Sequence, residues 1–353
     1  MKIQSIEIKK ETEQNLKKIM EAVRPNDSMA FVMYGSPDPD AIASTMSLHR
    51  IIQKTKGLVK HAFISTEALS RQQNIELASA MRLNIQLINN VDLNTFRLIA
   101  LFDAQPSFFK NNLPSINPQM VFDHHPREGQ WQADFEDIRP DYGALSSVMT
   151  EYLLYSRVQI PRNLHTALMY GIKTDTGNFN RDTIFEDISA YTYHSKRANI
   201  QLIQRIELNQ TPKRFLKYFD HAYRHTKIFH SGCICYLGVT ESADACVQVA
   251  DFYVRLIGVN YVVVAGIVGG KLIVIFRGDG YRRDCGTLAE TAFGDLGSGG
   301  GHKSAARMEI TLETLRQKLN GDLSQKAIDR FLLMSLKRKH ARTFLKNNAQ
   351  KVQ

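Results

Sequence analysis

The chain has 353 residues, which is enough for two domains and excludes a single small module. Hydrophobic residues make up 43% of it and charged residues 23%, so a largely disordered chain is excluded as well. The formal net charge of +10 favours polyanionic partners such as RNA, DNA or nucleotides. The most apolar stretch, residues 256–270, is shorter than a membrane-spanning helix, so we expect buried strands there and no membrane partner.

Two features of the sequence predict a reduced, cytoplasmic location. The N-terminal sequence MKIQSIEIKKETEQ lacks the apolar core of a secretion signal. The cysteines show neither the pairing nor the density of a disulfide framework, and two of them alternate with apolar residues as in the core of a strand. They are Cys233, Cys235, Cys246 and Cys285.

Short apolar runs alternate with helical patterns in the first half of the chain. Residues 29–34 have the pattern of a buried strand, and after the turn GSPDPD the apolar positions of residues 41–55 recur at helical spacing. Further short strands are predicted at residues 58–65, 84–89, 98–103 and 119–125. This alternation is typical of an α/β fold with a parallel sheet, whose ligands bind beyond the carboxyl ends of the strands.

A helical stretch and a second set of strands follow. Residues 187–222 have helical periodicity, and strands are predicted at 232–239, 261–268 and 271–277, with a helix at 244–256. The sequence therefore predicts a parallel-sheet domain at residues 1–195, a helical linker at 196–227 and a smaller mixed-sheet α/β domain at 228–330. The active-site cleft is expected between the two domains.

The final segment, residues 331–353, is predicted to be a basic tail. No acidic residue offsets its positive charges after residue 336. A solvated helical tail is the main interpretation, and an auxiliary nucleic-acid contact is the alternative. The basic residues concerned are Lys337, Arg338, Lys339, Arg342, Lys346 and Lys351.

Acidic side chains follow several of the predicted strands. Asp38 and Asp40 lie in the turn after the first strand, Asp103 ends the strand at 98–103, and Asp-His-His at 123–125 ends the next. Asp175 lies where a predicted helix runs into a glycine-bounded turn. Two of these positions have an ordinary alternative, because Asp40 could simply cap the following helix and an acid such as Asp103 often ends an apolar strand. The Asp-His-His group is harder to explain in this way.

Carboxylates and imidazoles gathered at one edge of a sheet favour a site for divalent metal ions. Hard oxygen ligands with no thiolate nearby suit Mn²⁺ or Mg²⁺ better than structural zinc. Unscreened carboxylates would raise one another's pKa values, whereas two divalent ions about 3.5–4 Å apart neutralise them. We therefore expect two ions, Mn²⁺ or Mg²⁺, that lower the pKa of a bridging water from about 15.7 towards 7 for attack on phosphorus.

The order and spacing of these motifs resemble those of the DHH phosphoesterase superfamily. The matching segments are PDPDA, the aspartate after LIALF, DHH, and the aspartate of GIKTDTGNF. Residues 297–306, GSGGGHKSAA, resemble the GGGH motif of the associated substrate-binding DHHA1 domain. The resemblance covers residues 25–310 and implies a DHH domain followed by a DHHA1 domain.

The resemblance also implies a set of metal ligands. Asp38 would bind one metal ion, and Asp40 and Asp175 would bind the other. Asp103 would bridge the two ions, and His124 would complete the second site.

Two catalytic residues and a substrate-binding group are implied in the same way. His125 would donate to the scissile phosphate, and Asp123 would orient an imidazole. In the DHHA1 domain, the glycine run would form a loop that leads into a helix and lets backbone N–H groups approach an anion. The substrate-binding residues would be Arg277, Gly299, Gly300, Gly301 and His302.

The resemblance implies a Mn²⁺-dependent phosphodiesterase similar to the bacterial oligoribonucleases, or nanoRNases, with short RNA or linear dinucleotides as substrates. One alternative is a nucleotide 3'-phosphatase that acts on adenosine 3',5'-bisphosphate. Another is a non-catalytic nucleotide or RNA sensor. A homodimer stays open, and no pattern in the sequence predicts a protein partner.

One position departs from the family pattern. Many members have a histidine three residues before the first proline of this motif, where it binds the first metal ion, but this chain has Tyr34. A neutral phenol is a poor ligand for such ions. Either the first site keeps only Asp38 and Asp103, or it has been rebuilt around Tyr34, and this departure is what keeps the sensor alternative open.

Replacement of Tyr34 by histidine separates these two interpretations. We expect Tyr34→His to lower the Mn²⁺ concentration needed for half-maximal activity, because imidazole binds such ions better than a phenol. The measurement is a Mn²⁺ titration of dinucleotide hydrolysis with both proteins. An unchanged or weaker metal requirement would mean that the site has been rebuilt around the phenol.

Overall fold

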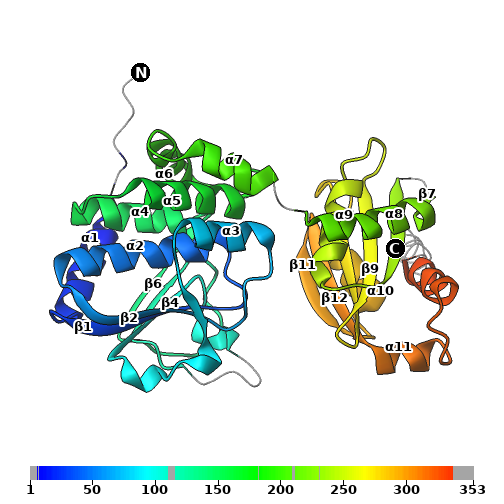
Figure 1. Ribbon diagram of the computed structural model, residues 1–353, viewed down its shortest axis with the longest axis horizontal. Helices are drawn as coiled ribbons and strands as arrows, with labels where there is room; N and C mark the ends of the chain where they lie inside the picture. The colour runs from blue at the N-terminus through cyan, green and yellow to red at the C-terminus, as the bar shows by residue number, and fades with distance from the viewer. Residues whose placement is uncertain are drawn as a thin grey trace, which may run out of the picture. The chain divides into compact units, whose positions relative to one another are not determined.

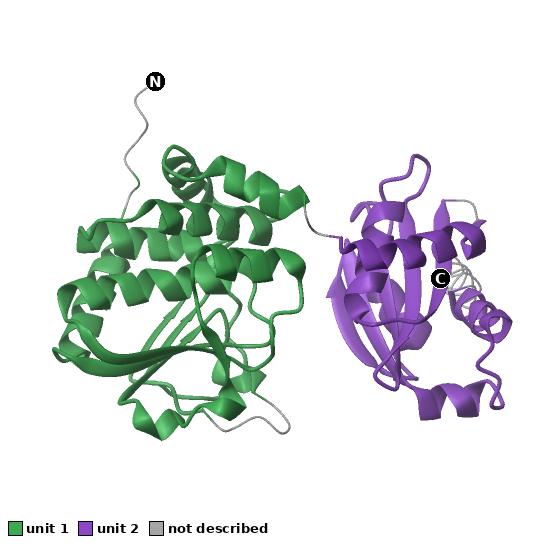
Figure 2. Cartoon of the chain, viewed as in Figure 1, with its two compact units in different colours: residues 1–210 green, residues 211–353 purple. Residues whose placement is uncertain are grey.

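The computed structural model describes residues 6, 8–109, 116–181, 183–208, 211–229 and 231–336. The chain divides into two compact units, residues 1–210 and residues 211–353 (Figures 1 and 2). Among the described residues, no helix is both long and apolar enough to cross a membrane. The predicted positive charges at residues 337–353 lie outside the described residues.

A parallel sheet forms the centre of the first unit, as the sequence predicts. The strand order is β3-β2-β1-β4-β5-β6, and each described pair of neighbours runs parallel. β1 lies inside the sheet and is buried along almost its whole length, because both faces are covered. The strands are β1 (Asp27–Met33), β2 (Leu58–Ser65), β3 (Ile85–Leu87), β4 (Leu98–Phe102), β5 (Met120–Asp123) and β6 (Phe135–Ile138).

The two faces of this sheet are covered by different kinds of structure. Phe31 of β1 packs in a core built with the helices, which lie together on one side of the sheet (Figure 1). Ala30 and Val32 point the other way and pack with Phe96 and Ile116 of the connecting segments. The helices are α1 (Lys10–Ala22), α2 (Pro39–Thr55), α3 (Gln72–Ala80), α4 (Leu145–Ser156), α5 (Arg162–Asp175), α6 (Phe185–Ser195) and α7 (Ile200–Leu208), and the connections contain η1 (Ile88–Asn90), η2 (Leu93–Thr95) and η3 (Pro106–Phe108).

A glycine lets three helices meet at the end of the sheet. A Cβ atom at Gly171 of α5 would lie 2.6 Å from Oγ of Ser146 in α4 and 3.1 Å from Cα of Asp40 in α2. Glycine is therefore needed for the close approach of α5 to both neighbours. Asp175 lies four residues later on the same face of α5, so this packing also decides where Asp175 points.

A buried network of ion pairs joins α1, β6 and α4. The guanidinium of Arg139 donates two hydrogen bonds of 2.8 Å to Asp137 and one of 2.8 Å to Thr12 Oγ1, and its Nη1 lies 3.3 Å from Glu151 Oε2. Removal of one partner from such a network leaves a buried charge uncompensated, at a cost of about 3–5 kcal/mol. The network therefore fixes α1 and α4 against the last strand of the sheet.

A mixed sheet forms the centre of the second unit, again as predicted. The strand order is β11-β12-β10-β9-β8-β7, in which β8 and β9 run parallel and the other described pairs run antiparallel. α8 and α9 cover one face, whereas α10, α11 and the helical residues 325–336 cover the other. The elements are η4 (Lys213–Phe215), α8 (Leu216–His225), β7 (Lys227–Phe229), β8 (Gly232–Val239), α9 (Ala243–Tyr253), β9 (Tyr261–Val268), β10 (Lys271–Gly278), α10 (Cys285–Phe293), β11 (Ser298–His302), β12 (Ala305–Thr311) and α11 (Leu312–Lys318).

The range 196–227, where the sequence predicts a helical linker, contains two helices that pack in different units. Ile203 and Ile206 of α7 belong to the core of the first unit. Tyr218 and Ala222 of α8 belong to a core of the second unit. The division between the units falls between residues 210 and 211, inside this range.

Gly171→Ala tests the close packing of α5. Alanine normally stabilises a helix by about 1 kcal/mol relative to glycine. Here the added methyl group would crowd Ser146 and the backbone of Asp40, so we expect a net loss of about 1–3 kcal/mol in the free energy of unfolding. Denaturant unfolding followed by circular dichroism measures the change. Gly300→Ala is the control, because no atom lies within 4 Å of the Cβ position there, and stabilisation by Gly171→Ala would contradict the close packing.

Candidate metal centre

The predicted acidic residues gather at the carboxyl edge of the parallel sheet. Asp38 follows β1, Asp103 follows β4 directly, and Asp123 is the last residue of β5. Parallel strands bring these ends to one edge. Asp103 has a left-handed backbone conformation, with φ of 52°, and its N–H donates to Phe122 O at 2.8 Å, which turns the chain towards the end of β5.

The two aspartates of the first motif have different roles in the fold. Asp38 caps α2, because its carboxylate accepts a 2.9 Å hydrogen bond from Ala41 N. Asp40 is fully buried and accepts hydrogen bonds of 2.7 Å each from Leu145 N and Ser146 N at the start of α4. The alternative that Asp40 only caps its own helix is therefore wrong, since Asp38 is the cap and the carboxylate of Asp40 joins two helices.

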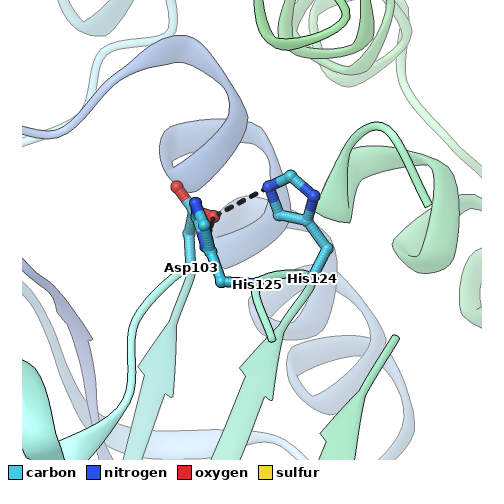
Figure 3. Close-up of side chains that lie close together, drawn as sticks. All are labelled: Asp103, His124 and His125. Atoms are coloured by element: carbon cyan, nitrogen blue, oxygen red, sulfur yellow. Dashed lines mark ion pairs between the residues drawn. The ribbon is translucent and has the colours of Figure 1, made fainter. Parts of the chain in front are cut away.

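His124 is oriented by a backbone carbonyl. Its Nδ1 lies 3.0 Å from Tyr142 O, and because a carbonyl oxygen only accepts, Nδ1 is the protonated nitrogen. The other nitrogen, Nε2, lies 2.9 Å from Asp175 Oδ2 and 3.4 Å from Asp103 Oδ1. Figure 3 shows the ring of His124 directed at Asp103, with His125 beside the same carboxylate. Nε2 of His124 is thus the ring atom that faces two carboxylates.

The side-chain atoms of Asp103, His124 and Asp175 that face one another are better suited to binding a metal ion than to hydrogen bonding with each other. Asp103 Oδ1, His124 Nε2 and Asp175 Oδ2 are buried and lack hydrogen-bond partners among the described residues. Converging electron-pair donors of this kind are what a divalent cation requires. Within the described part of the chain, two groups have ligand atoms within 4.8 Å of one another, and both contain His124: Asp103, His124 and His125, and Asp40, His124 and Asp175.

The electrostatics of the cluster point to the same need for positive charge. Burial, together with the charges of Asp103 and Asp175, raises the pKa of Asp38 to about 7. Burial is also the main cause that raises the pKa values of Asp40 and Asp103. Burial alone would lower the pKa of His124, but Asp103 and Asp175 outweigh it and raise the pKa to about 12. The cluster therefore retains protons wherever no metal ion replaces them.

His125 lies on the open side of the cluster. Its side chain is 47% exposed, and its Nδ1 lies 2.8 Å from Asp123 Oδ1 and 3.6 Å from Asp103 Oδ1. The hydrogen bond to Asp123 is the main cause that raises the pKa of His125. Because Nδ1 is engaged by Asp123, Nε2 is the nitrogen left to face a substrate.

Asp123 is fully buried and saturated with hydrogen bonds. Its Oδ1 also accepts from the backbone N–H groups of His124 and His125, and its Oδ2 accepts a 2.8 Å hydrogen bond from Gln105 Nε2. Unlike Asp103 Oδ1 and Asp175 Oδ2, neither oxygen of this carboxylate is a buried atom without a hydrogen-bond partner in the described part of the chain. The geometry suits a residue that orients His125.

Two residues near the centre were not found from the sequence. Gln105 is fully buried, and in addition to Asp123 it binds Pro126 O and Glu128 N, so it fixes the segment after the histidines. Its position two residues after Asp103 is the only local signal. Arg181 follows the turn after α5, and its Nη1 lies 3.7 Å from Asp175 Oδ1.

Tyr34 packs among aromatic rings. Its ring meets those of Phe108 and Phe109 edge to face, with centroids 6.0 Å and 5.2 Å away, and Phe108 in turn meets His125 at 6.2 Å. Tyr34 is nevertheless 41% exposed.

The predicted substrate-binding residues form a separate group in the second unit. Arg277 of β10 and His302 of β11 both pair with Ala305, so they lie in one row and on one face of the mixed sheet. Arg277 Nε also donates to Asp251 at 2.6 Å.

The glycine run is an exposed edge strand, β11, and the expectation of a loop leading into a helix is wrong. The physical reason is close pairing with β12. A Cβ at Gly299 would lie 2.1 Å from Arg307 O, and one at Gly301 would lie 2.3 Å from Ala306 Cβ, whereas Gly300 faces open space. Two of the three glycines are therefore needed for strand packing, and Gly300 is the one open to a ligand.

No protein-family model matches the chain. It is 28% identical over 296 residues to the uncharacterized protein MJ1633 of Methanocaldococcus jannaschii, which covers 83% of this chain and 60% of that protein. It is 25% identical over 247 residues to the bifunctional oligoribonuclease and PAP phosphatase NrnA of Mycoplasma genitalium, which covers 65% of this chain and 73% of that protein. The chain thus spans about 60% of the length of the first relative.

One solved structure shares the fold over nearly the whole chain. It is an exopolyphosphatase-related protein from Bacteroides fragilis, with a TM-score of 0.72 and 16% sequence identity. The match covers 95% of this chain and 98% of that protein. At this level of identity the likeness establishes the two-part α/β fold.

The raised pKa values of this cluster predict how the stability of the folded chain depends on pH and on bound Mn²⁺. The pKa of Asp38 is raised from 3.8 to about 7, so between these values the metal-free folded chain holds more protons than the unfolded chain. Its stability therefore falls as pH rises through this window, and the raised pKa of His124 continues the fall at higher pH. Because metal binding needs deprotonated ligands, we expect Mn²⁺ to raise the melting temperature more at about pH 8 than at about pH 5.5.

A matched pair of variants isolates the contribution of the cluster. Asp38 and Asp284 each cap a helix, α2 and α10, with one carboxylate. Asp38→Asn should reduce both the pH dependence and the gain from Mn²⁺, whereas Asp284→Asn should change neither, because asparagine caps a helix about as well as aspartate does. Differential scanning fluorimetry with and without chelator gives both quantities. Equal responses of the two variants would speak against the metal centre.

Proposed function

We propose that this chain, a relative of the DHH phosphoesterases in fold and motifs, is a divalent-metal-dependent phosphodiesterase that hydrolyses short oligoribonucleotides or linear dinucleotides. The observation that carries the proposal is the set of buried, unpartnered ligand atoms of Asp103, His124 and Asp175 at the end of the described parallel sheet. Oligoribonuclease activity is part of the name of the Mycoplasma genitalium relative. The net charge of +10 suits a polyanionic substrate.

The mixed set of oxygen and imidazole ligands suits two divalent ions, with Mn²⁺ preferred and Mg²⁺ as the alternative. When bound, the ions would screen the charge of the substrate phosphate and lower the pKa of a water molecule beside it. The ligands would be Asp38, Asp40, Asp103, His124 and Asp175.

His125 would act on the substrate from the open side of the centre. Since Nδ1 is bound to Asp123 Oδ1, Nε2 would donate a hydrogen bond or a proton to the phosphate or to the leaving oxygen. The hydrogen bond to Asp123 raises the pKa of His125, which favours its donating form. Asp123 would act through His125 and is therefore a positioning residue.

The nucleotide would be bound by the second unit. β11 stands at the end of the described sheet, so one side of this strand has no neighbouring strand there, and backbone N–H groups of such an edge suit an anion. Gly300 leaves the approach to this backbone open. Arg277 and His302, in one row beside it, would supply positive charge and a ring.

A nucleotide 3'-phosphatase acting on adenosine 3',5'-bisphosphate is the second candidate. PAP phosphatase activity is the other half of the name of the Mycoplasma genitalium relative. The same ligands and the same donor would serve both reactions, because each displaces an oxygen from phosphorus. A non-catalytic sensor is disfavoured, since it has no need of the buried carboxylates that the fold keeps at the cost of their repulsion.

Asp103→Ala tests the metal centre. Asp103 contacts both His124 and His125, and its removal takes away the proposed bridge, so we expect hydrolysis to fall by about a thousandfold or more. Initial rates with Mn²⁺ and a dinucleotide give the comparison. Asp134→Ala, at an exposed aspartate before β6, should leave the rate unchanged.

A panel of substrates decides between the candidate functions. Dinucleotides, longer oligoribonucleotides, adenosine 3',5'-bisphosphate and inorganic polyphosphate are each incubated with the full chain and Mn²⁺. Release of mononucleotides supports the phosphodiesterase, and release of phosphate from the bisphosphate supports the second candidate. Near-normal turnover in Asp103→Ala, or no hydrolysis of any substrate by the wild-type chain, would refute the proposal.

A further inference from the structure

The chain turns sharply after α5, immediately beyond the candidate ligand Asp175. Gly177, Asn178 and Phe179 all have left-handed backbone conformations, with φ of 58°, 57° and 62°. Glycine adopts this conformation freely and asparagine tolerates it, so a cost of order 1–3 kcal/mol falls on Phe179. Three successive left-handed residues beside the candidate metal centre indicate that this turn has a specific role there.

Thr176 holds this turn in place. Its Oγ1 accepts a 3.2 Å hydrogen bond from Phe179 N, and its carbonyl oxygen accepts 3.1 Å hydrogen bonds from Asn180 N and Arg181 N. The ring of Phe179 also packs edge to face on Tyr191, with centroids 5.1 Å apart. The turn therefore returns the chain to the end of α5.

The residue brought back by the turn is Arg181. Its Nη1 donates to Asp175 O at 2.9 Å and lies 3.7 Å from Asp175 Oδ1, while 54% of its side chain stays exposed. A Cβ at Gly177 would lie 3.3 Å from both Cγ and Nε of Arg181, so the glycine makes room for the arginine. The guanidinium is thus fixed beside the acidic cluster with an exposed edge.

A continuous series of contacts runs from His125, through the proposed ligands, to Arg181. His125 Nδ1 lies 3.6 Å from Asp103 Oδ1, and His124 Nε2 lies 3.4 Å from the same oxygen. His124 Nε2 also lies 2.9 Å from Asp175 Oδ2, and Asp175 Oδ1 lies 3.7 Å from Arg181 Nη1. His125 and Arg181 therefore flank the proposed metal ligands, and both are partly exposed.

We propose that Arg181 is a substrate-binding residue that donates from its guanidinium to the non-bridging oxygens of the scissile phosphodiester, from the Asp175 side of the centre. The inference rests on the proposed function and adds the residue that recognises the charge of the reacting phosphate. Guanidinium N–H groups bind phosphate oxygens through charge-assisted hydrogen bonds, often in pairs. The hydrogen bond to Asp175 O occupies Nη1 and leaves the exposed edge for the substrate.

A purely structural role is the competing explanation, because an arginine that donates to a carbonyl at a helix end also stabilises that end. The chain contains a matched case. Arg197 follows α6, is exposed, and donates from Nη1 to Tyr193 O at 2.9 Å. Arg181→Gln keeps an amide that can donate to Asp175 O but removes the charge, so it separates the two roles.

The test compares wild type, Arg181→Ala, Arg181→Gln, Arg181→Lys and Arg197→Ala in the full chain with Mn²⁺. Two fluorescent dinucleotides that resist hydrolysis serve as binding probes: a phosphorothioate, which keeps the negative charge of the linkage, and a methylphosphonate, which lacks it. We expect Arg181→Ala and Arg181→Gln to weaken the phosphorothioate by about 10- to 100-fold and to leave the methylphosphonate unchanged. Arg181→Lys should restore part of the affinity, and Arg197→Ala should match wild type.

Kinetics and melting temperatures complete the comparison. On a natural dinucleotide, kcat/KM should fall by about 10- to 100-fold in Arg181→Gln, with an unchanged melting temperature. Equal losses with both probes, or a loss that follows the melting temperature, would assign Arg181 to structure and overturn the inference. If the wild-type chain binds the probes but hydrolyses nothing, the proposed function fails while the probe comparison still decides the role of Arg181. If it neither binds nor hydrolyses, both fail.

Discussion

Like charges buried together at the end of a parallel sheet are the constraint on which the rest of the first unit depends. Asp40 and Asp103 are packed where burial and mutual repulsion disfavour their ionised forms. Backbone N–H groups at helix starts partly offset this repulsion. The first N–H groups of α4 donate to Asp40, and Asp38, the N-cap of α2, accepts a hydrogen bond from the start of that helix. These N–H dipoles do not neutralise all of the negative charge of the carboxylates. The remaining charge favours the binding of cations at this edge of the sheet.

The buried acids of this edge divide into two kinds according to their hydrogen bonds. Asp123 has its lone pairs taken by two backbone N–H groups, His125 and Gln105, so it is committed to the protein. Asp103 and Asp175 keep oxygens without such partners among the described residues. Aspartate therefore has a structural role at position 123 and a candidate ligand role at positions 103 and 175. The hydrogen-bond donors around each side chain distinguish the two roles.

The sequence predicts the sheet and the location of the centre, because periodic apolar runs ending in acids carry both kinds of information locally. The two-part α/β fold that the resemblance to the DHH superfamily implies is confirmed. Contacts between distant segments were not predictable. The packing of Tyr34 on Phe108 depends on a separate connection, and the return of Arg181 depends on a left-handed turn that includes Phe179, a residue that rarely adopts this conformation. The glycines of β11 looked like a loop because sequence does not show how closely β12 approaches.

The hydrogen bonds from α4 to Asp40 have a consequence for folding, since they join residues 105 and 106 positions apart. Contacts of such high sequence separation form late and slow the search for the native state. During synthesis, the first motif leaves the ribosome long before α4 and α5 can reach it. In the nascent chain the acidic residues are therefore exposed to solvent, which screens their charges from one another. The centre forms only when α4 and α5 pack against the first motif.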